Sequence, residues 1–402
     1  MNHRFLGYQR ENGAVGIRNH VLIIPAQRQL NMVAQKISDM VPDTRAFISL
    51  GELGRPKEDR LVLHRTMTGL GINPNTASVL ILGSTKQAGY EELKVERISS
   101  EISKAGKRVE VLLLTEEGGW YNLLGKGIKV ARDMVREASR ARREPFGFEN
   151  LVLGVKCGMS DSTSGICGNP TVGRVFDKLV QAGGRAVFSE TTEVIGAEHV
   201  LIRRAKNEEV AQKILKAVEQ TEQKAKSVGE DIRETNPIPE NIAGGLTTLE
   251  EKSLGAIVKA GSSTIEDVIA YGQPIEKPGL YFMDAWMSSL SLPTGYAASG
   301  VHLFMYQMGG AGVPGREFPP PSISAGIVSP IMYLTGNYQT YERGEDNIDF
   351  NSGTILQDTE TPEAAADRLL AMILEIASGA KTKTETINHQ DPVELYFQGP
   401  SL

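Results

Sequence analysis

The segment NLVLGVKCGMSDSTSGICGNPTVG, residues 150–173, indicates the fold class of this 402-residue chain. A short apolar run changes abruptly into Cys, Ser, Asp, Thr, Gly and Asn, and a helical pattern begins near residue 172. Apolar runs of this kind between helical segments are typical of strands covered on both faces, hence of a parallel sheet. The polar residues follow the carboxyl end of the strand, which is where ligands bind in open α/β sheets.

The same alternation extends along the chain in both directions. Further strands are expected at HVLIIP (20–25), RAFISL (45–50), ASVLILG (77–83), RVEVLLL (108–114), RAVFSE (185–190), GLYFM (279–283) and VHLFMYQM (301–308). Helices are expected near residues 30–40, 57–69, 91–104, 172–182, 207–228 and 362–378. A basic helical stretch, residues 125–143, is stopped by Pro145, where we place a domain boundary. We predict an α/β fold with two doubly wound, mostly parallel sheet domains, residues 1–145 and a catalytic domain of residues 146–402.

The composition argues against several classes of protein. A formal net charge of −6 argues against binding of nucleic acid, which needs a basic face. Two cysteines in so long a chain do not form a disulfide framework. No run reaches the roughly 18 apolar residues that span a membrane, and the start MNHRFLGYQRENG is too polar for a signal peptide. We therefore expect a cytoplasmic protein without a nucleic-acid or membrane partner.

The first candidate site is the polar part of the opening segment. It offers four hydrogen-bonding groups for an anionic substrate and one carboxylate for a metal ion, namely Cys157, Ser160, Ser164, Asn169 and Asp161. The pair Asn169-Pro170 is typical of a helix start, whose free N–H groups would point at a carboxylate or sulfonate. The alternative is an ordinary strand-to-helix loop.

The second candidate site is SETTEV, residues 189–194, again directly after an expected strand. Glu190 and Glu193 are carboxylates that can move protons, and Thr191 can bind substrate. The alternative is that these acids only stabilise the first turn of a helix.

Further candidates lie in later segments and at one early position. In GGLTTLEEKSLG, residues 244–255, Glu250 is a candidate metal ligand and Lys252 a candidate base or oxyanion anchor. Helix capping explains the same pattern equally well. Asp284, at the end of an expected strand, is another candidate metal ligand, while Asn19 and Asn337 are candidate substrate-binding residues. The Gly- and Pro-rich loop at 309–321 is a candidate cover for the active site.

Several of these motifs together resemble the altronate/galactarate dehydratase family. The similar segments, in order, are GYQRENGAVGIRNHVLIIP (7–25), LVLGVKCGMSDSTSGICGNPTVG (151–173), FSETTEVIGAEHVLIRRA (188–205), GGLTTLEEKSLG (244–255), GLYFMDA (279–285) and IDFNSGTIL (348–356). Six motifs in matching order and spacing make a chance similarity implausible. The C-terminal LYFQG matches the usual end of such chains, so we interpret it as native and not as the remnant of a protease tag.

The resemblance implies a lyase that uses a divalent metal, Fe2+ by family analogy, to eliminate a β-substituent from a small anionic 2-hydroxy acid. Under it, Glu190, Glu193 or Lys252 would be the base. Asp161 and Asp284, with Glu250 as a further candidate, would bind the metal.

Two departures from the family pattern narrow the choice of substrate. The sugar-acid dehydratases usually carry cysteines where this chain reads SLGELGRPKED (49–59) and LGSTKQAGYEEL (82–93), and a TGRG motif where it reads QMGGAGVPG (307–315). Single-chain members also carry an N-terminal SAF-type domain, whereas this sequence starts at the large domain, as in the two-subunit (2R)-sulfolactate sulfo-lyases. We expect the large subunit of an oligomeric enzyme with a small SAF-type partner, converting (2R)-3-sulfolactate to pyruvate and sulfite. The alternatives are a sugar-acid dehydratase and a non-catalytic scaffold or binding subunit.

Overall fold

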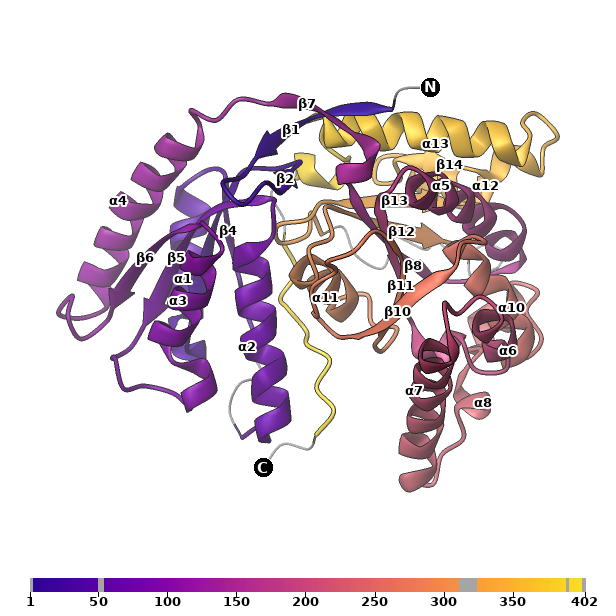
Figure 1. Cartoon of the computed structure of the whole chain (residues 1–402), viewed down its shortest axis with the longest axis horizontal. Coiled ribbons are helices and arrows are strands. Elements are labelled where there is room, and N and C mark those ends of the chain that lie inside the picture. The colour runs from indigo at the N-terminus through magenta and orange to yellow at the C-terminus, as the bar shows by residue number, and fades with distance from the viewer. Residues whose placement is uncertain (1–2, 50–53, 311–323, 388–389, 400–402) are drawn as a thin grey trace.

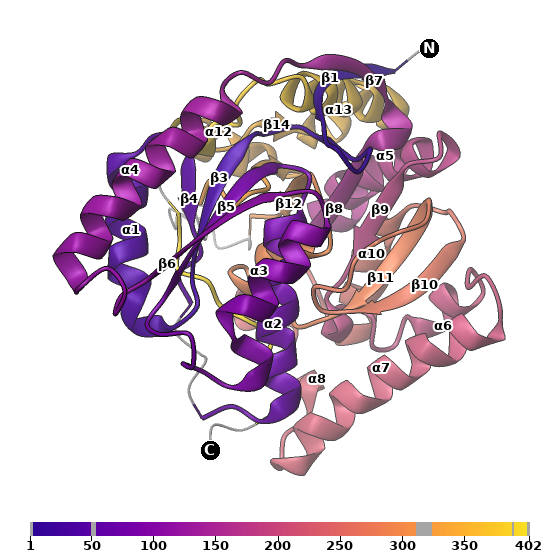
Figure 2. The same ribbon diagram turned by 60° about the vertical axis from the view of Figure 1, so that its left-hand side comes forward.

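Two parallel sheets organise the chain, in a computed structural model that describes residues 3–49, 54–310, 324–387 and 390–399. The smaller sheet has the order β4-β3-β5-β6 and the larger the order β10-β11-β9-β8-β12-β13-β14, and every pairing in both is parallel. Figures 1 and 2 show the two sheets in separate lobes. The predicted α/β class with parallel sheets is confirmed.

The smaller sheet is covered by helices on both faces. Its strands are β3 (His20–Pro25), β4 (Thr44–Ala46), β5 (Thr76–Gly83) and β6 (Arg108–Leu113). Helices α1 (Asn31–Met40) and α4 (Trp120–Ala138) share one apolar cluster with Val21 and Ile23, whereas α2 (Lys57–Ile72) and α3 (Val95–Lys104) share another with Leu22 and Ile24. Alternate residues of β3 therefore point to opposite faces, which explains its uninterrupted apolar sequence.

The chain begins the larger sheet with its central strand. It first adds strands on one side of that strand and then changes once to the other side. The strands of this sheet are β8 (Val152–Gly158), β9 (Arg185–Phe188), β10 (Ile265–Ala270), β11 (Gly279–Asp284), β12 (Leu303–Met308), β13 (Ile331–Thr335) and β14 (Phe350–Asn351). The chain adds β9, β10 and β11 on one side of β8 and then returns to place β12 on its other side. The strand order thus reverses between β8 and β12, and the loops after these two strands lie at the reversal point, where ligands bind in such sheets.

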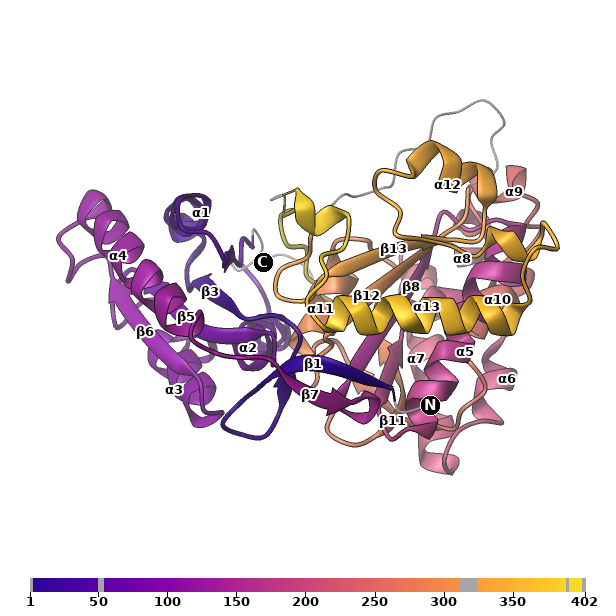
Figure 3. The same ribbon diagram turned by 90° about the horizontal axis from the view of Figure 1, so that it is seen from above.

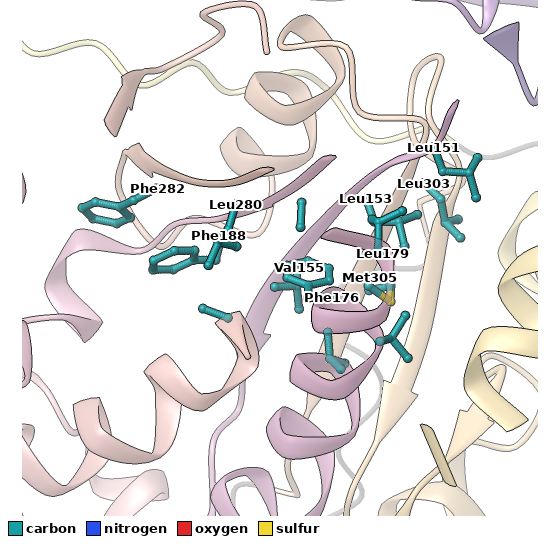
Figure 4. Packing of buried hydrophobic residues seen from close by; sticks show 14 of the residues in the cluster. Leu151, Leu153, Val155, Phe176, Leu179, Phe188, Leu280, Phe282, Leu303 and Met305 are labelled. Atoms are coloured by element: carbon teal, nitrogen blue, oxygen red, sulfur yellow. The ribbon is translucent and has the colours of Figure 1, made fainter. Parts of the chain in front are cut away.

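Helices α5 (Asn169–Gln181) and α13 (Pro362–Ala377) pack on one face of the larger sheet. Figure 4 shows Leu153 and Val155 of β8 against Phe176 and Leu179 of α5. The remaining helices of the larger domain are α6 (Glu198–Ile202), α7 (Glu208–Ser227), α8 (Ile232–Thr235), α9 (Pro239–Ala243), α10 (Leu249–Ile257), α11 (Ser291–Ala298) and α12 (Tyr338–Gly344). This packing buries the central strands of the sheet and leaves its carboxyl edge for the site.

The two domains share part of their core. Leu63 and Met67 of α2 belong to the same apolar cluster as Leu292 and Tyr296 of α11. Gly69 of α2 permits the close approach of the helices, because a Cβ there would lie 2.3 Å from the carbonyl oxygen of Ala298.

A second link between the domains is the strand β1 (Arg4–Gln9), which pairs antiparallel with β2 (Val15–Gly16) and β7 (Glu144–Gly147). Figure 3 shows β1 and β7 side by side between the lobes. The boundary that we placed at residue 145 falls inside β7.

The C-terminal tail, residues 390–399, returns to the smaller domain (Figure 1). The N–H of Val393 donates to the carbonyl oxygen of Ile48 at 2.9 Å, next to the end of β4. The buried Asp59 carboxylate accepts the N–H groups of Gln398 at 2.8 Å and Gly399 at 3.0 Å, while Lys224 of α7 donates to the side chain of Gln398 at 3.1 Å. The tail therefore contacts both domains.

Most expected elements lie where the sequence places them, with instructive differences. The expected strand at 45–50 is only Thr44–Ala46, and the basic helix begins at Trp120 and ends at Ala138, before Pro145. Three strands of the larger sheet, β10, β13 and β14, were not predicted. The strand β10 carries partly exposed acids, β13 follows the Pro-rich loop, and β14 has only two residues. Of that loop, the candidate cover, residues 311–321 lie outside the described part of the chain. Among the residues described, no helix is long and apolar enough to cross a membrane.

We expect Glu385→Gln to lower the free energy of unfolding by about 3 kcal/mol, because it leaves the buried Arg18 guanidinium without its counter-charge. Glu385 accepts Arg18 Nε and Nη2 at 2.7 Å each, and both side chains are less than 10% exposed. Denaturant unfolding measures the change. In the matched control Glu137→Gln, which removes an exposed partner of Arg108, the loss should stay within about 1 kcal/mol. Equal losses in the two variants would contradict a structural role for the buried pair.

Candidate active site

A cavity of about 520 Å³ opens at the carboxyl end of β8. Its polar lining comes mainly from the loop after that strand: Cys157, Ser160, Asp161, Ser162, Ser164 and Asn169, together with Glu251 and Lys252 of α10. Its apolar lining includes Ile166, Leu246, Leu254, Ala256 and Val258. The cavity therefore lies at the reversal of strand order described above.

Asp161 holds the loop after β8 in place. Its Oδ1 accepts the N–H of Thr163 at 2.9 Å, and its Oδ2 accepts the N–H of Gly310 at 2.7 Å and the Asn337 amide at 2.8 Å. Gly310 follows β12 and Asn337 follows β13, so one carboxylate joins the ends of three strands. Its oxygens are engaged by these donors, which gives Asp161 a structural role at the cavity wall.

The loop enters α5 through a π-helix, Ser164–Gly168. The N–H of Asn169 bonds to the carbonyl oxygen of Ser164, so the helical hydrogen bonds begin before the predicted start. The expectation of free N–H groups at Asn169-Pro170 is therefore wrong, because the π-helix satisfies them. Extra turns of this kind often occur at functional sites.

Below the cavity lies an ion network of five buried side chains, which we call the Lys–Glu network: Lys156, Glu190, Glu193, Lys252 and Lys259. Glu190 contacts Lys156 Nζ at 3.1 Å and also pairs with Lys259. Glu193 contacts Lys259 Nζ at 3.1 Å and Lys252 Nζ at 3.5 Å. Each of the five side chains is at most 7% exposed.

Electrostatic attraction outweighs burial in the network. Burial alone would lower the pKa of Lys156 and Lys259, yet Glu190 and Glu193 raise both pKa values above the usual lysine range. Burial alone would raise the pKa of Glu193, but Lys259, Lys252 and Lys156 hold it below its usual value. Glu193 therefore stays ionised at neutral pH and is a weak base.

Glu190 occupies a strained backbone conformation, with φ 79° and ψ 68° in the left-handed region. A non-glycine residue holds this conformation only where its surroundings enforce it. Here Lys156 and Lys259 bind the side chain, and its Oε2 accepts the N–H of Cys157 at 2.9 Å. The strain thus places the carboxylate directly beneath a residue that lines the cavity.

The floor of the cavity is built around Cys157. Its Sγ lies 3.0 Å from Ser160 Oγ, 3.3 Å from Gln307 Oε1 and 3.6 Å from Asn169 Nδ2. Burial, with the charge of Glu193, raises the pKa of this thiol to about 11, so it is neutral at physiological pH.

Unpaired polar atoms gather near this floor. Asn169 Oδ1, Asn236 Nδ2 and Ser253 Oγ are buried without a hydrogen-bond partner among the described residues. Buried polar groups are otherwise nearly always paired. A bound ligand or water would satisfy such atoms, and Asn169 itself lines the cavity.

The structure brings most of the predicted site residues together. Cys157, Ser160, Asp161, Ser164, Asn169 and Lys252 line the cavity, Glu190 and Glu193 lie beneath it, and Asn337 binds Asp161. Thr191 directs its hydroxyl away from the network, to Asp284 Oδ1 at 2.7 Å.

Two predicted residues lie elsewhere. Glu250 is half exposed and pairs with Arg233 Nε at 2.8 Å, because the helical period turns it away from Lys252. Asn19 precedes β3, at the amino edge of the smaller sheet, and its amide bonds to Arg10 and to the carbonyl oxygen of Ala138. Neither lines the cavity described above.

The expected metal ligands do not form a set. Asp161 is engaged by amide donors, Asp284 by Thr191 and Glu250 by Arg233. Over the described ranges, no group of three or more His, Cys, Asp or Glu side chains could hold a metal ion. Glu190 and Glu193, which lie beneath the cavity, are already neutralised by ammonium groups. The residues described thus do not fit the iron site that the resemblance implies, and no step below is routed through a metal.

Three residues of the site were not singled out from the sequence: Lys156, Lys259 and Gln307. Lys156 lies in LVLGVK and Lys259 in AIVKAG, so each is a lone lysine within an apolar run. A lysine that is buried in this way must be paired with a carboxylate. That signal was available and would have predicted that each of these lysines has a buried carboxylate partner, although not which one.

Comparisons with known proteins agree with the motifs. Residues 148–398 match the family described as D-galactarate/altronate dehydratase, C-terminal, and residues 7–139 match D-galactarate dehydratase/altronate hydrolase, second domain. The C-terminal match includes residues 395–398, so LYFQ lies within the region that the family shares, which supports the native tail.

Curated relatives cover nearly the whole chain. The (2R)-sulfolactate sulfo-lyase subunit beta of Chromohalobacter salexigens is 34% identical over 391 residues, 96% of each chain. The altronate dehydratase of Bacillus subtilis is 30% identical over 97% of this chain and 76% of its own length. The galactarate dehydratase (L-threo-forming) of Escherichia coli is 32% identical over 79% of this chain and 59% of its own. All three are lyases or dehydratases by name.

We expect Glu193→Gln to lower the pKa of the Cys157 thiol below its value of about 11, because a nearby negative charge disappears while Lys259 remains. Thiolate absorbance against pH, in a Cys167→Ser background that leaves a single thiol, measures the shift. An unchanged or higher pKa would show that Glu193 is not placed beside Cys157 as described.

Proposed function

Because the chain belongs to the D-galactarate/altronate dehydratase family, we propose that it is the large subunit of a lyase acting on a small anionic 2-hydroxy acid. The proposed substrate is (2R)-3-sulfolactate and the products are pyruvate and sulfite. The similarity to a sulfo-lyase beta subunit over 96% of both chains supports this choice.

The observation that carries the proposal is the charge of the Lys–Glu network. Three ammonium groups face two carboxylates, so the network itself carries one positive charge in excess. A buried charge without a partner is costly, and a bound anion would supply the missing partner. Lys252 is the network member that lines the cavity, so it is the group that meets the substrate.

The distribution of polar groups favours a short substrate. The buried polar residues of the lining include Cys157, Ser160 and Lys252, whereas Ile166, Leu254 and Val258 form a partly exposed aliphatic wall. A six-carbon sugar acid carries hydroxyl groups along its whole length, and such a wall would leave several without partners. A three-carbon acid places both of its anionic groups near the floor.

The reaction is a β-elimination. The C2 proton leaves to a base, the electrons of the C2–H bond form the C2–C3 double bond, and the C3–S bond breaks with its electron pair going to sulfite. The resulting enol gains a proton at C3 and loses the proton of its hydroxyl group to give pyruvate. Negative charge develops on the carboxylate and C2 during proton removal, and a fixed positive charge lowers the energy of that state.

We assign Lys252 this electrostatic role. Its Nζ is held by Asn236 Oδ1 at 2.6 Å and Asn241 Oδ1 at 3.1 Å. Ser160, Ser164 and Asn169 are assigned to the anionic ends of the substrate. The lowered pKa of Glu193 makes it a poor acceptor for the C2 proton. The acceptor then lies outside the network, and the assay below therefore includes a partner chain and iron.

The proposal also includes a partner subunit and a subcellular location. The sulfo-lyase relative is named a beta subunit, and we propose that this chain also assembles with a small SAF-type subunit into an oligomer in the cytoplasm. A non-catalytic scaffold role would leave the network without a function, since its burial costs free energy that packing alone does not require.

The second candidate function is dehydration of altronate or a related sugar acid. Two altronate dehydratases are 30% and 28% identical over 97% and 98% of this chain, and a cavity of about 520 Å³ is large enough for six carbons. The two candidates differ in the leaving group, water or sulfite, and share the elimination at C2 and C3.

An anaerobic assay with the purified chain, the proposed small SAF-type subunit and added ferrous iron separates the candidates. Each acid, sulfolactate and altronate, is supplied in turn, and sulfite and keto acid are measured. Sulfite and pyruvate in equal amounts are expected. A keto acid from altronate without activity on sulfolactate would refute the proposed substrate, and omission of iron shows whether a metal is required.

Lys252→Met should lower kcat/KM by at least about 100-fold, because it removes the charge that meets the anionic substrate. The matched control Lys226→Met removes an exposed lysine of α7 and should leave kcat/KM within about twofold. Steady-state kinetics on both variants provide the comparison. A loss of less than tenfold for Lys252→Met would exclude Lys252 from the substrate contact.

A further inference from the structure

We propose that Lys259 is a positioning residue that holds Glu190 and Glu193 together beneath the cavity and so keeps the excess positive charge on Lys252. The inference rests on the proposed function, because it explains how that charge is maintained.

Lys259 lies outside the cavity but touches both carboxylates. It belongs to the turn η6 (Val258–Ala260) that directly follows α10, and its side chain is 1% exposed. Its Nζ pairs with Glu190 and lies 3.1 Å from Glu193 Oε2. It does not line the cavity, so it cannot contact the substrate there.

The two carboxylates need such a bridge because they are held close together. Both lie on the short turn after β9, where the N–H of Glu193 donates to the carbonyl oxygen of Glu190 at 2.8 Å. Two ionised carboxylates at short distance in a buried site repel each other strongly. A single ammonium group between them turns this repulsion into attraction.

Each bridged carboxylate contacts a residue of the cavity. Glu190 Oε2 accepts the N–H of Cys157 at 2.9 Å, and Glu193 Oε1 lies 3.5 Å from Lys252 Nζ. Lys252 in turn donates to Asn241 Oδ1, and Asn241 Nδ2 donates to the carbonyl oxygen of Ser160 at 2.8 Å. Displacement of either carboxylate would therefore shift Cys157 or Lys252 at the cavity floor.

Loss of Lys259 would cancel the excess charge. Two ammonium groups, Lys156 and Lys252, would face two carboxylates, and Glu193 would lose the neighbour that most lowers its pKa. The charged or titratable groups that remain around the pair are Lys156 and Cys157 of β8, Tyr296 of α11, Tyr306 of β12 and Lys252 of α10. Protonation of Glu193 would then restore one positive charge, so activity would return as the pH falls.

The test compares Lys259→Met with the charge-matched double variant Lys259→Met/Glu190→Gln. At pH 8 the single variant should lose about 100-fold in kcat/KM, and the loss should shrink towards pH 6 as Glu193 takes up a proton. The double variant keeps Lys156, Lys252 and Glu193, hence one positive charge in excess. We expect it to recover at least about tenfold over the single variant, with kcat/KM independent of pH in this range.

If Lys259 had a purely structural role, we would expect the opposite result, because a second buried substitution would lower kcat/KM further. A double variant no better than the single one, or a single variant whose loss is the same at pH 6 and pH 8, would overturn the proposal. Circular dichroism and unfolding midpoints verify that the variants compared are folded.

If neither Lys259 variant folds, the proposal is tested with the variant Glu190→Gln alone. Lys259 then still holds Glu193, the excess of positive charge in the network rises from one to two, and the loss in kcat/KM should stay well below that of Lys252→Met at all pH values. A loss as large as that of Lys252→Met would overturn the proposal. Each kcat/KM is measured with whichever acid the wild-type enzyme converts. The test of Lys259 therefore still applies if sulfolactate is not the substrate.

Discussion

Burial of five ionised side chains beneath one cavity is the constraint on which the rest of the structure depends. Charges removed from water are tolerated only when they alternate in sign at short distance, so Lys156, Glu190 and Lys259 must come from three elements in fixed register. The left-handed backbone of Glu190 is one consequence of this requirement. A fold that merely needed a stable core would gain more from apolar residues at these positions, which supports the functional role that we propose for the network.

The order of strands gives the network its place. Because the chain returns from β11 to add β12 on the free side of β8, the loops after β8 and β12 lie at the reversal and leave room for a cavity. Asp161 joins these loops through Gly310 and Asn337, so the opening is held by the ends of three strands. The order of the strands therefore sets the position of the site, as expected for open α/β sheets, and the side chains that follow the strands set its chemistry.

The sequence predicted the sheets better than it predicted the roles of the site residues. Uninterrupted Val, Ile and Leu runs identify buried parallel strands, because both faces of such strands are covered. Polar strand ends drew attention to Cys157, which lines the cavity, and to Glu190, whose carboxylate accepts the N–H of Cys157. Spacing alone could not show that Glu250 turns outward, or that the lone lysines Lys156 and Lys259 reach the carboxylates, because these contacts join segments far apart in sequence.

The most direct measurement is a crystal structure of the protein with 3-sulfopropanoate, an analogue of sulfolactate that lacks the 2-hydroxyl group. Anomalous scattering from its sulfur atom would locate the sulfonate independently of the refined coordinates. The account predicts the analogue in the cavity above Cys157, with one anionic group within about 3 Å of Lys252 Nζ. An analogue bound elsewhere at saturating concentration, with the cavity unoccupied, would contradict the claim that the Lys–Glu network exists to bind an anionic substrate.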